Sequence, residues 1–333
     1  MRRFWLAGFA AAALVAVAVP LIRDPPPTLQ DTADDLVASG VPGVLVRLRD
    51  GAEIRQLAAG DATTDARFRV GSVTKTFVAT LALRLIDDGL LALDDPVERY
   101  VPGLLADGDR VTVRDLLAHT AGLFDYTSDP ELLRGEQPPS ALVAIANRRE
   151  RTQGYAYSST NYLALGLVLE AAAGAPLGDL LSRRVFRPAG LRETTFEPGP
   201  VSGIHLHGHD RSAHDGVATG SLRDTSSRSA RSAWAAGAVV STAADLDRFF
   251  SWLLSGELGR RMRPVANARY GLDLARFETR CGQVVGHTGN VLGMLTVVWA
   301  RNDRLLVVAA NVYPLTPEQE SKLQLLLGRA FCS

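Results

Sequence analysis

Ser72 and Lys75 have the residue types and the spacing of a nucleophile and its general base. They stand in the run Ser-Val-Thr-Lys, ahead of apolar residues that recur at helical spacing from Phe77 to Leu85, and Gly89 ends the pattern. Three residues along a helix is nearly one turn, so the two side chains should lie side by side at a helix N-terminus. There the lysine amine can accept the proton of the serine hydroxyl, which predicts nucleophilic catalysis.

Lysine is rare in this chain. Of the 36 basic residues only Lys75 and Lys322 are lysine, and all others are arginine. Only lysine can lose its proton near neutral pH when its neighbours are apolar, whereas arginine stays charged. This favours a chemical role for Lys75. Ser-x-x-Lys also occurs by chance on amphipathic helices, so the pair needs other motifs beside it.

Two other stretches supply such motifs. Residues 154–162 read Gly-Tyr-Ala-Tyr-Ser-Ser-Thr-Asn-Tyr, and residues 285–290 read Val-Gly-His-Thr-Gly-Asn. With the Ser-x-x-Lys helix, they follow the order found in penicillin-recognising serine hydrolases, and the chain resembles that family. The likeness is closest to the branch that holds class C beta-lactamases, serine DD-carboxypeptidases and related esterases. It extends through residues 70–77, 91–97, 116–123, 186–191 and 237–246.

The resemblance implies catalysis through an acyl-enzyme. Ser72 would attack a carbonyl while Lys75 or an ionised Tyr157 takes its proton, and both bases stay open at this point. Tyr157 would then protonate the departing amine or oxygen, a task that suits a phenol whose pKa is lowered by a nearby ammonium. The N–H groups of Ser72 and Asn290 would hold the oxyanion. This chemistry needs neither a metal nor an organic cofactor.

Three residues of the third motif would meet the substrate. The resemblance implies that His287 and Thr288 bind its carboxylate or polar tail, and that Gly289 leaves room for it to pair along the strand edge. Beta-lactamases generally carry lysine where this chain has His287. Because histidine is mostly neutral at pH 7, it is a weaker carboxylate anchor, which favours a DD-peptidase or an esterase over a lactamase.

The tyrosine motif departs from the family pattern Tyr-x-Asn. Its third position is Ser159, and an asparagine follows two places later, at Asn161. A serine hydroxyl is shorter than the asparagine side chain and lacks the paired donor and acceptor of an amide. Contact with a substrate amide would then be lost or made through water, which bears on peptidase and lactamase efficiency.

The surrounding pattern predicts an α/β fold of the beta-lactamase/DD-peptidase type. Asp50-Gly51 joins strand-like runs at 43–49 and 53–59 into a hairpin, and further strands are expected at 283–287, 293–300 and 305–312. These make an antiparallel sheet of about five strands, covered by helices at 29–39 and 317–331. The helices of an inserted, mainly helical part are expected at 74–88, 113–118, 139–147, 161–173, 177–185 and 243–254. The polar stretch 205–234 is expected to be a long surface excursion beside the cleft.

This pattern divides the chain into an N-terminal segment, 1–28, and one serine hydrolase domain, 29–333. Within the domain we expect a sheet subdomain built from 29–70 and 275–333 and a helical subdomain, 71–274, with the cleft between them. Basic and acidic residues number 36 each, so the net charge is zero and no basic face for nucleic acid is indicated. The expected partner is a small-molecule or peptide substrate with an acyl group, such as a cell-wall peptide, an ester or a beta-lactam.

The N-terminal segment has the order of an export signal. Two arginines precede an apolar run at 4–22, and three prolines follow at 25–27. We expect an exported protein, secreted or extracytoplasmic, in which 4–22 is either removed or kept as a membrane anchor. An oxidising compartment favours a disulfide between Cys281 and Cys332, which would hold the C-terminal helix, over two buried free thiols.

These observations favour an exported D-alanyl-D-alanine carboxypeptidase that acts on cell-wall peptides. The alternatives are an esterase or a beta-lactamase of the same family, and a non-catalytic sensor that binds penicillin or peptidoglycan. A Ser-His-Asp hydrolase is disfavoured because no Gly-x-Ser-x-Gly elbow lies between a strand and a helix.

The remaining histidines have simpler interpretations. His205, His207 and His209 alternate as metal ligands can, but no supporting shell of acidic residues is evident, so we interpret them as part of a solvated loop. His119 stands at a helix end and is interpreted as a capping or packing residue.

Overall fold

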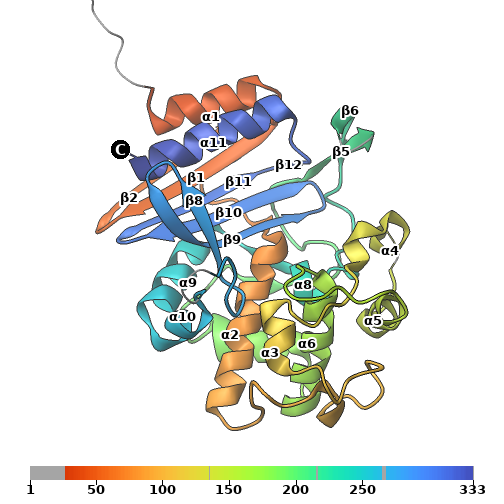
Figure 1. Ribbon diagram of the computed structural model, residues 1–333. Helices are drawn as coiled ribbons and strands as arrows, with labels where there is room; N and C mark the ends of the chain where they lie inside the picture. Colours follow the sequence, from red (N-terminus) through yellow and green to blue (C-terminus); the bar gives the residue numbers. More distant parts are fainter. Residues whose placement is uncertain (1–26, 135, 215–216, 265–267, 333) are drawn as a thin grey trace, which may run out of the picture.

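The computed structural model describes residues 27–134, 136–214, 217–264 and 268–332; the export segment predicted at the N-terminus falls almost wholly outside this part. An antiparallel sheet lies between two layers of helices (Figure 1). The order of its six strands is β2-β1-β11-β10-β9-β8. Their bounds are β1 (Gly43–Asp50), β2 (Glu53–Gly60), β8 (Ala275–Thr279), β9 (Gly282–Val291), β10 (Met294–Arg301) and β11 (Arg304–Ala310). The predicted α/β fold is confirmed.

The strands of this six-stranded sheet form where the sequence predicts them, with one addition. Asp50 pairs with Glu53 across the predicted hairpin, whose turn places Gly51 at φ 58, a conformation that favours glycine. β11 is buried at every position after its first, as expected for a strand covered on both faces. The addition is β8, a short and partly exposed edge strand whose five residues lack a continuous apolar run.

Two helices cover one face of the sheet. They are α1 (Leu29–Ala38) and α11 (Pro317–Cys332), and their apolar sides share a core with β1, β10 and β11. Cys281 and Cys332 form a disulfide with a Cα–Cα distance of 5.4 Å. The bond ties the turn between β8 and β9 to the end of α11.

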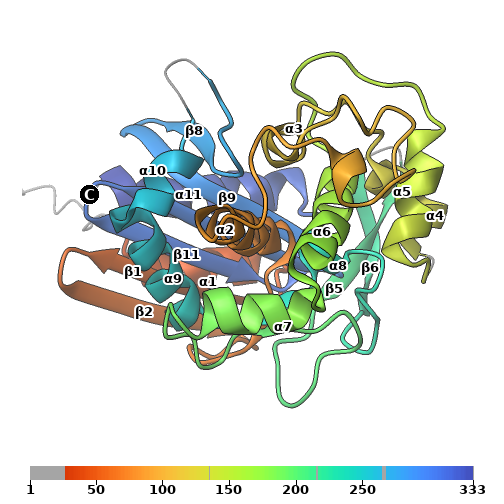
Figure 2. The ribbon, with the colours of Figure 1, turned by 90° about the horizontal axis from the view of Figure 1, so that it is seen from below.

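The other face carries the larger helical layer. Helix α2 (Thr74–Asp87) runs through its centre and is buried along most of its length; Figure 2 shows it end-on, with α9 on one side and α6 on the other. The ring of Phe77 stacks on Phe249 at 4.0 Å and meets Phe186 edge-on at 5.5 Å. The other α-helices of the layer are α3 (Val113–Ala118), α4 (Pro130–Arg134), α5 (Pro139–Asn147), α6 (Ser159–Ala173), α7 (Leu177–Leu181), α8 (Trp234–Gly237), α9 (Ala243–Ser255) and α10 (Glu257–Met262). The helix predicted at 177–185 changes at Ser182 to a π-helical turn that ends at Phe186.

A small sheet leads the chain into the site. It has the order β3-β7-β4, formed by β3 (Phe68–Arg69), β7 (Val239–Ser241) and β4 (Thr195–Phe196). Directly after β3 the chain turns through η1 (Gly71–Val73), a short 3-10 helix, into α2. Val70, which links β3 to η1, donates its N–H to the carbonyl of Val239 at 3.0 Å. This pairing fixes the start of the turn that holds Ser72.

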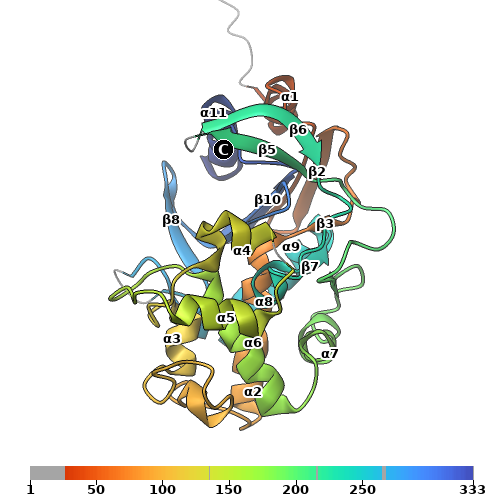
Figure 3. The same ribbon diagram turned by 90° about the vertical axis from the view of Figure 1, so that its right-hand side faces the viewer.

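The stretch expected as a surface excursion contains a hairpin, which the sequence did not predict. Its strands are β5 (His209–His214) and β6 (Val217–Asp224), and β5 pairs in parallel with β12 (Val312–Tyr313). Figure 3 shows the hairpin standing beside α11 and the main sheet. Its base is joined to the β9–β10 turn through Thr225, whose hydroxyl donates to the carbonyls of Gly208 (2.9 Å) and Leu292 (2.6 Å).

No single helix in the described ranges is both long and apolar enough to cross a membrane. One bent pair, Ser159–Ala173 with Leu177–Phe186 at 77°, has sufficient length and composition, and most of α6 is buried in the protein core.

Candidate active site

The predicted nucleophile and base lie in contact. The amine Nζ of Lys75 donates to Ser72 Oγ at 2.9 Å and to the carbonyl of Ala236 at 3.0 Å. Gly71 takes φ 54, and a β-carbon there would approach the backbone N of Asn290 to 2.6 Å. Glycine is therefore required at 71 both by the backbone conformation and by the closeness of β9.

Lys75 is suited to accept a proton. Its side chain has no exposed surface, and burial lowers the lysine pKa to about 8, against the opposing effects of Asp125 and Asp273. A substantial fraction of the amine is then neutral in mildly alkaline solution. The predicted role of Lys75 as general base has the geometry and the electrostatics that it needs.

Tyr157 lies beside this pair but differs from its expected electrostatics. Its ring centroid is 5.2 Å from Lys75 Nζ, the residue lines the pocket, and 37% of its surface is exposed. Burial of the phenol nevertheless raises the pKa of Tyr157 strongly, and the hydrogen bond with Ser72 offsets only part of this. The expectation of a phenol with a lowered pKa is therefore wrong. A neutral phenol donates protons, so this structure favours Lys75 over an ionised Tyr157 as the base.

His119 supports Tyr157 from behind, in agreement with its interpretation as a capping and packing residue. It ends α3 in the left-handed conformation, at φ 57, and its ring lies 4.3 Å from that of Tyr157. Nδ1 accepts the N–H of Ser158 at 3.2 Å and lies 3.1 Å from Nδ2 of Asn161. Burial holds the pKa of His119 well below its usual value, so the ring is neutral.

The two polar residues after Tyr157 face different ways. Ser159 lines the pocket, and its N–H donates to Asp125 at 3.1 Å. Asn161 is fully buried and faces His119, so it does not replace the missing asparagine of the family motif. The pocket therefore presents serine, and not asparagine, at this point of its lining.

Strand β9 reaches the nucleophile at Gly289 and Asn290. A β-carbon on Gly289 would lie 2.1 Å from the carbonyl oxygen of Val70 and 2.8 Å from the N of Ser72. This glycine therefore makes room for the nucleophile turn, whereas we expected it to make room for substrate. Asn290 lines the pocket, and its backbone lies against Gly71. The N–H groups of Ser72 and Asn290 thus belong to two segments that touch, as the predicted oxyanion site requires.

His287 does not have the position expected of a carboxylate anchor. It is 3% exposed, lies outside the lining of the pocket, and places Nε2 3.2 Å from the hydroxyl of Tyr270. Nδ1 lies 2.5 Å from the carbonyl of Thr288, which is also absent from the lining. Burial lowers the pKa of His287, with Asp273 opposing the shift. A buried, neutral imidazole gives little attraction to a substrate carboxylate.

Asp273, a buried acid next to Tyr162 and His287, was not identified from the sequence. Asp273 has no exposed surface, and its Oδ1 accepts from Tyr162 at 2.9 Å and lies 3.8 Å from Nε2 of His287. The backbone of Asp273 has φ 91, where side chains are rarely found, and Oδ2 has no hydrogen-bond partner among the described residues. A strained, buried acid so close to Lys75 is more typical of a functional site than of packing.

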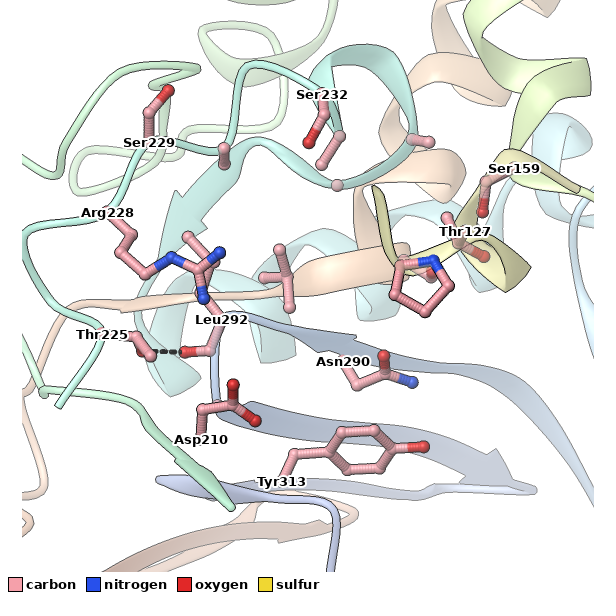
Figure 4. A pocket seen from close by; sticks show the side chains of 18 of the residues that line it. Thr127, Ser159, Asp210, Thr225, Arg228, Ser229, Ser232, Asn290, Leu292 and Tyr313 are labelled. Atoms are coloured by element: carbon pink, nitrogen blue, oxygen red, sulfur yellow. Dashed lines mark hydrogen bonds between the residues drawn. The ribbon is translucent and has the colours of Figure 1, made fainter. Parts of the chain in front are cut away.

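The pocket that contains these groups has a volume of about 900 Å³. Ser159 and Thr127 lie at one end of it, Arg228 and Asp210 at the other, and Asn290 between them (Figure 4). The excursion that holds the β5–β6 hairpin supplies much of its far wall. Within the described ranges, no group of three or more His, Cys, Asp or Glu residues is placed to hold a metal ion. His207 pairs instead with Asp224, at 3.0 Å.

Comparison with known proteins identifies the family. A sequence model of the family described as Beta-lactamase matches residues 29–324, nearly all of the described chain. The chain belongs to this family. It is a serine hydrolase of the beta-lactamase and penicillin-binding protein type, which confirms the resemblance seen in the sequence.

Relatives and solved structures agree with this assignment. Penicillin-binding protein 4 of Amycolatopsis lactamdurans is 34% identical over 175 residues, 47% of this chain and 45% of that protein. A putative D-alanyl-D-alanine carboxypeptidase of Salmonella paratyphi A is 26% identical over 182 residues, 47% and 41% of the two chains. The matched regions span less than two thirds of the curated relatives' own lengths, from 31% to 52% of the first few.

The solved structures match over much more of their length. The D-stereospecific amidohydrolase from Streptomyces sp. has a TM-score of 0.80 and 31% identity, over 91% of this chain and 98% of that one. The D-amino acid amidase from Ochrobactrum anthropi SV3 has a TM-score of 0.78 and 26% identity, over 90% and 97%. Both support the fold and the class of enzyme.

Proposed function

We propose that this serine hydrolase cleaves amide bonds at the carbonyl of D-configured amino acid residues in short peptides. The contact that carries the proposal is the 2.9 Å hydrogen bond from the buried amine of Lys75 to Ser72 Oγ, in a pocket that Tyr157 also lines. D-Alanyl-D-alanine carboxypeptidase, which the sequence favoured, is one member of this class, and the D-stereospecific amidases are another. Curated relatives support the first, and full-length structural likeness supports the second.

The geometry suggests how acylation would proceed. Neutral Lys75 takes the proton of Ser72 as Oγ attacks the substrate carbonyl, and the N–H groups of Ser72 and Asn290 hold the resulting oxyanion. The neutral phenol of Tyr157 then gives its proton to the departing amine, and the proton that Lys75 took from Ser72 passes to the resulting phenolate, which restores both groups. Water attacks the acyl-enzyme in the second half, with the same residues moving protons in reverse.

The site favours an amidase, or a peptidase that does not require a terminal carboxylate, over a carboxypeptidase that does. A carboxypeptidase must hold the free carboxylate of its leaving residue, and the residue expected to do so, His287, is buried outside the pocket lining. An amide leaving group needs no such anchor. The curated relatives keep the carboxypeptidase as the second candidate.

Esterase, beta-lactamase and sensor functions have less support. Esterase and beta-lactamase activities use the same acyl-enzyme, and Ser159 in place of asparagine weakens the contact that a lactam amide would use. A non-catalytic penicillin or peptidoglycan sensor would not need a lysine with a pKa lowered to about 8 beside its serine. Export, followed by secretion or membrane anchoring through residues 4–22, remains our proposal for where the enzyme acts.

Matched chromogenic substrates test the proposal. We expect hydrolysis of an N-acyl-D-alanyl p-nitroanilide by the wild type, none by Ser72→Ala, and a much lower rate on the L-alanyl isomer. Intact mass after incubation with a penicillin reports acylation of Ser72 separately. Hydrolysis of D-alanyl-D-alanine peptides at rates well above the corresponding amides would favour the carboxypeptidase. Equal rates on the two isomers, or activity that survives Ser72→Ala, would contradict the proposal.

A further inference from the structure

Asp125 joins two segments of the active site without lining the pocket itself. It lies directly before η3 (Tyr126–Ser128), a short 3-10 helix. Its Oδ1 accepts the N–H of Ser159 at 3.1 Å and that of Thr127 at 3.2 Å. Those two residues lie at one end of the pocket (Figure 4), whereas Asp125 is absent from the lining. The carboxylate therefore acts on the backbone of the site and not on a ligand in the pocket.

Helix α6 begins without a cap of its own. Its N-cap is Ser158, whose side chain makes no hydrogen bond to the first turn. The first N–H groups of a helix have no partner within the helix, so they need acceptors from outside. Asp125 supplies one to the N–H of Ser159, and a negative charge is favoured at this end of a helix. The start of α6 is thus held by a residue from another segment.

Tyr157 stands immediately before this helix start and is supported from two sides. On one side, Nδ1 of His119 accepts the N–H of Ser158 at 3.2 Å. On the other side, the carbonyl of Phe124 accepts the hydroxyl of Ser158 at 3.3 Å, and the contact with Asp125 follows one residue later. These contacts fix the backbone from which the phenol of Tyr157 reaches the nucleophile.

The charge of Asp125 also acts on the two groups that move protons. Burial lowers the pKa of Lys75 to about 8, and Asp125 is the first of the charges that oppose this shift. Burial raises the pKa of Tyr157, and the charges of Asp273 and Asp125 add to the rise. A phenol kept in its protonated form is the form that a general acid needs.

We propose that Asp125 is a positioning residue that enables the site to cleave amides. By holding the start of α6, it keeps the phenol of Tyr157 where its proton can reach the leaving nitrogen as the carbon–nitrogen bond breaks. An amine leaves poorly unless it is protonated, whereas the anion of an acidic phenol leaves without a proton. Amides therefore depend on Asp125 far more than activated esters do. The inference rests on the proposed function, since it concerns the leaving group of the same substrates.

Three N-acetyl-D-alanyl substrates that differ only in their leaving group test the inference. They are the p-nitrophenyl ester, the p-nitroanilide and the unsubstituted anilide, in order of increasing need for a proton. We compare kcat/KM, which reports the steps up to the acyl-enzyme and is not masked by slow deacylation. Asp125→Ala should lose about a hundredfold on the anilide and only about threefold on the ester. An equal loss on all three would overturn the inference.

Two single variants separate position from charge and from general stability. Asp125→Asn keeps an oxygen that can accept the N–H of Ser159 but lacks the charge, so it should recover about tenfold of the loss on the anilide. An Asp125→Asn enzyme as slow as Asp125→Ala would contradict the positioning role. Asp31→Ala is the matched control, because Asp31 accepts the N–H of Thr28 at 2.6 Å at the start of α1, on the other face of the sheet. It should change none of the three values of kcat/KM.

A double variant tests whether Asp125 acts through Tyr157. Tyr157→Phe removes the proton donor and should itself lose most on the anilide and least on the ester. Two changes that act through one group are not additive, so adding Asp125→Ala to Tyr157→Phe should lower kcat/KM on the anilide by no more than about threefold. If the two losses multiply instead, Asp125 does not act through Tyr157 and the inference fails.

Crystal structures of the wild type and of Asp125→Ala test the inference without turnover. We expect the hydroxyl of Tyr157 to lie about 1 Å or more farther from Ser72 Oγ in the variant, a displacement sufficient for the predicted loss. A hydroxyl that has not moved would exclude the positioning role. Failure of the wild type to cleave both anilides would instead count against the proposed function, while the two crystal structures would still decide the role of Asp125.

Discussion

The back of the active site and its outer wall are built in opposite ways. Lys75, Asp273 and His287 are buried behind Ser72, where burial shifts the pKa of each and the neighbouring charges partly oppose or add to that shift. At the outer wall, Asp210 and Arg228 line the open part of the pocket. Withdrawal from water changes which protons can move, whereas access to the pocket leaves charges free to meet a ligand. We infer that the buried groups at the back of the site determine the reaction.

The largest effect that this comparison predicts comes from Lys75→Arg. Arginine cannot give up its proton near neutral pH, so acylation should fall by about a thousandfold. The rate of acylation by a chromogenic D-alanyl substrate, followed with intact mass, measures this. Lys322→Arg is the matched control, since it changes the only other lysine, on the far side of the sheet in α11. Substantial activity in Lys75→Arg would show that Lys75 is not the general base.

A second prediction concerns the contact of β9 with the nucleophile turn. Gly289→Ala places a methyl group 2.1 Å from the carbonyl oxygen of Val70, and backbone cannot move aside as a flexible side chain can. We expect a loss of about a hundredfold in kcat/KM and a lower melting temperature, because the strand and Ser72 must separate. In Gly328→Ala on α11 no atom lies within 4 Å of the new carbon, so that variant should keep its activity and be as stable as the wild type or slightly more so. A fully active Gly289→Ala would show that the two segments need not touch.

The pH dependence sharpens the comparison further. Lys75 must be neutral to act as a base, so kcat/KM should rise with pH and level off above about 8, the lowered pKa of this lysine. Ionised Asp273 favours the ammonium form, and its removal should lower the pKa of Lys75 further. In Asp273→Asn the rise of kcat/KM with pH should therefore occur at lower pH. Below about pH 8 this variant should keep a larger share of its own maximal kcat/KM than the wild type does.

Matched variants decide between an electrostatic and a packing role for Asp273. Asparagine tolerates the left-handed backbone that Asp273 adopts, and glycine at 273 relieves the strain of φ 91 altogether. Both substitutions remove the charge, so both should shift the pH dependence of kcat/KM in the same direction even though their stabilities differ. Arg228→Gln on the wall should leave it unchanged. If the pH dependence of kcat/KM were unchanged in both Asp273 variants, Asp273 would have a structural role only.

The contrast also explains what the sequence can predict. Ser72 and Lys75 are recognisable because one turn of helix brings together residues three apart, and the apolar strands of the main sheet are recognisable by their continuous runs. These are local relations, and the fold keeps them. The resemblance of the three ordered motifs to the family pattern then predicts Tyr157 beside the pair, and its ring centroid lies 5.2 Å from Lys75 Nζ.

Other features depend on partners that are distant in the sequence. On a strand, alternate residues face opposite sides, and only the packed structure shows that His287 faces Tyr270 instead of the pocket. Asp273 occupies a conformation that favours glycine, and nothing in its neighbourhood of the sequence marks a buried acid. The β5–β6 hairpin pairs with β12, a strand of two residues too short to leave a pattern.

The smallest effect is expected at Ser159, where the back of the site meets the open pocket. Its hydroxyl lines the pocket, but Asn161 cannot serve in its place because that side chain faces His119. Ser159→Asn restores a side chain with both a donor and an acceptor, so we expect kcat/KM for D-alanyl amides to rise by about fivefold while rates on esters change little. Asn161→Ser, made as a comparison, should instead disturb His119 and lower both rates. A gain on esters equal to that on amides would mean that residue 159 acts on Tyr157 and not on the substrate amide.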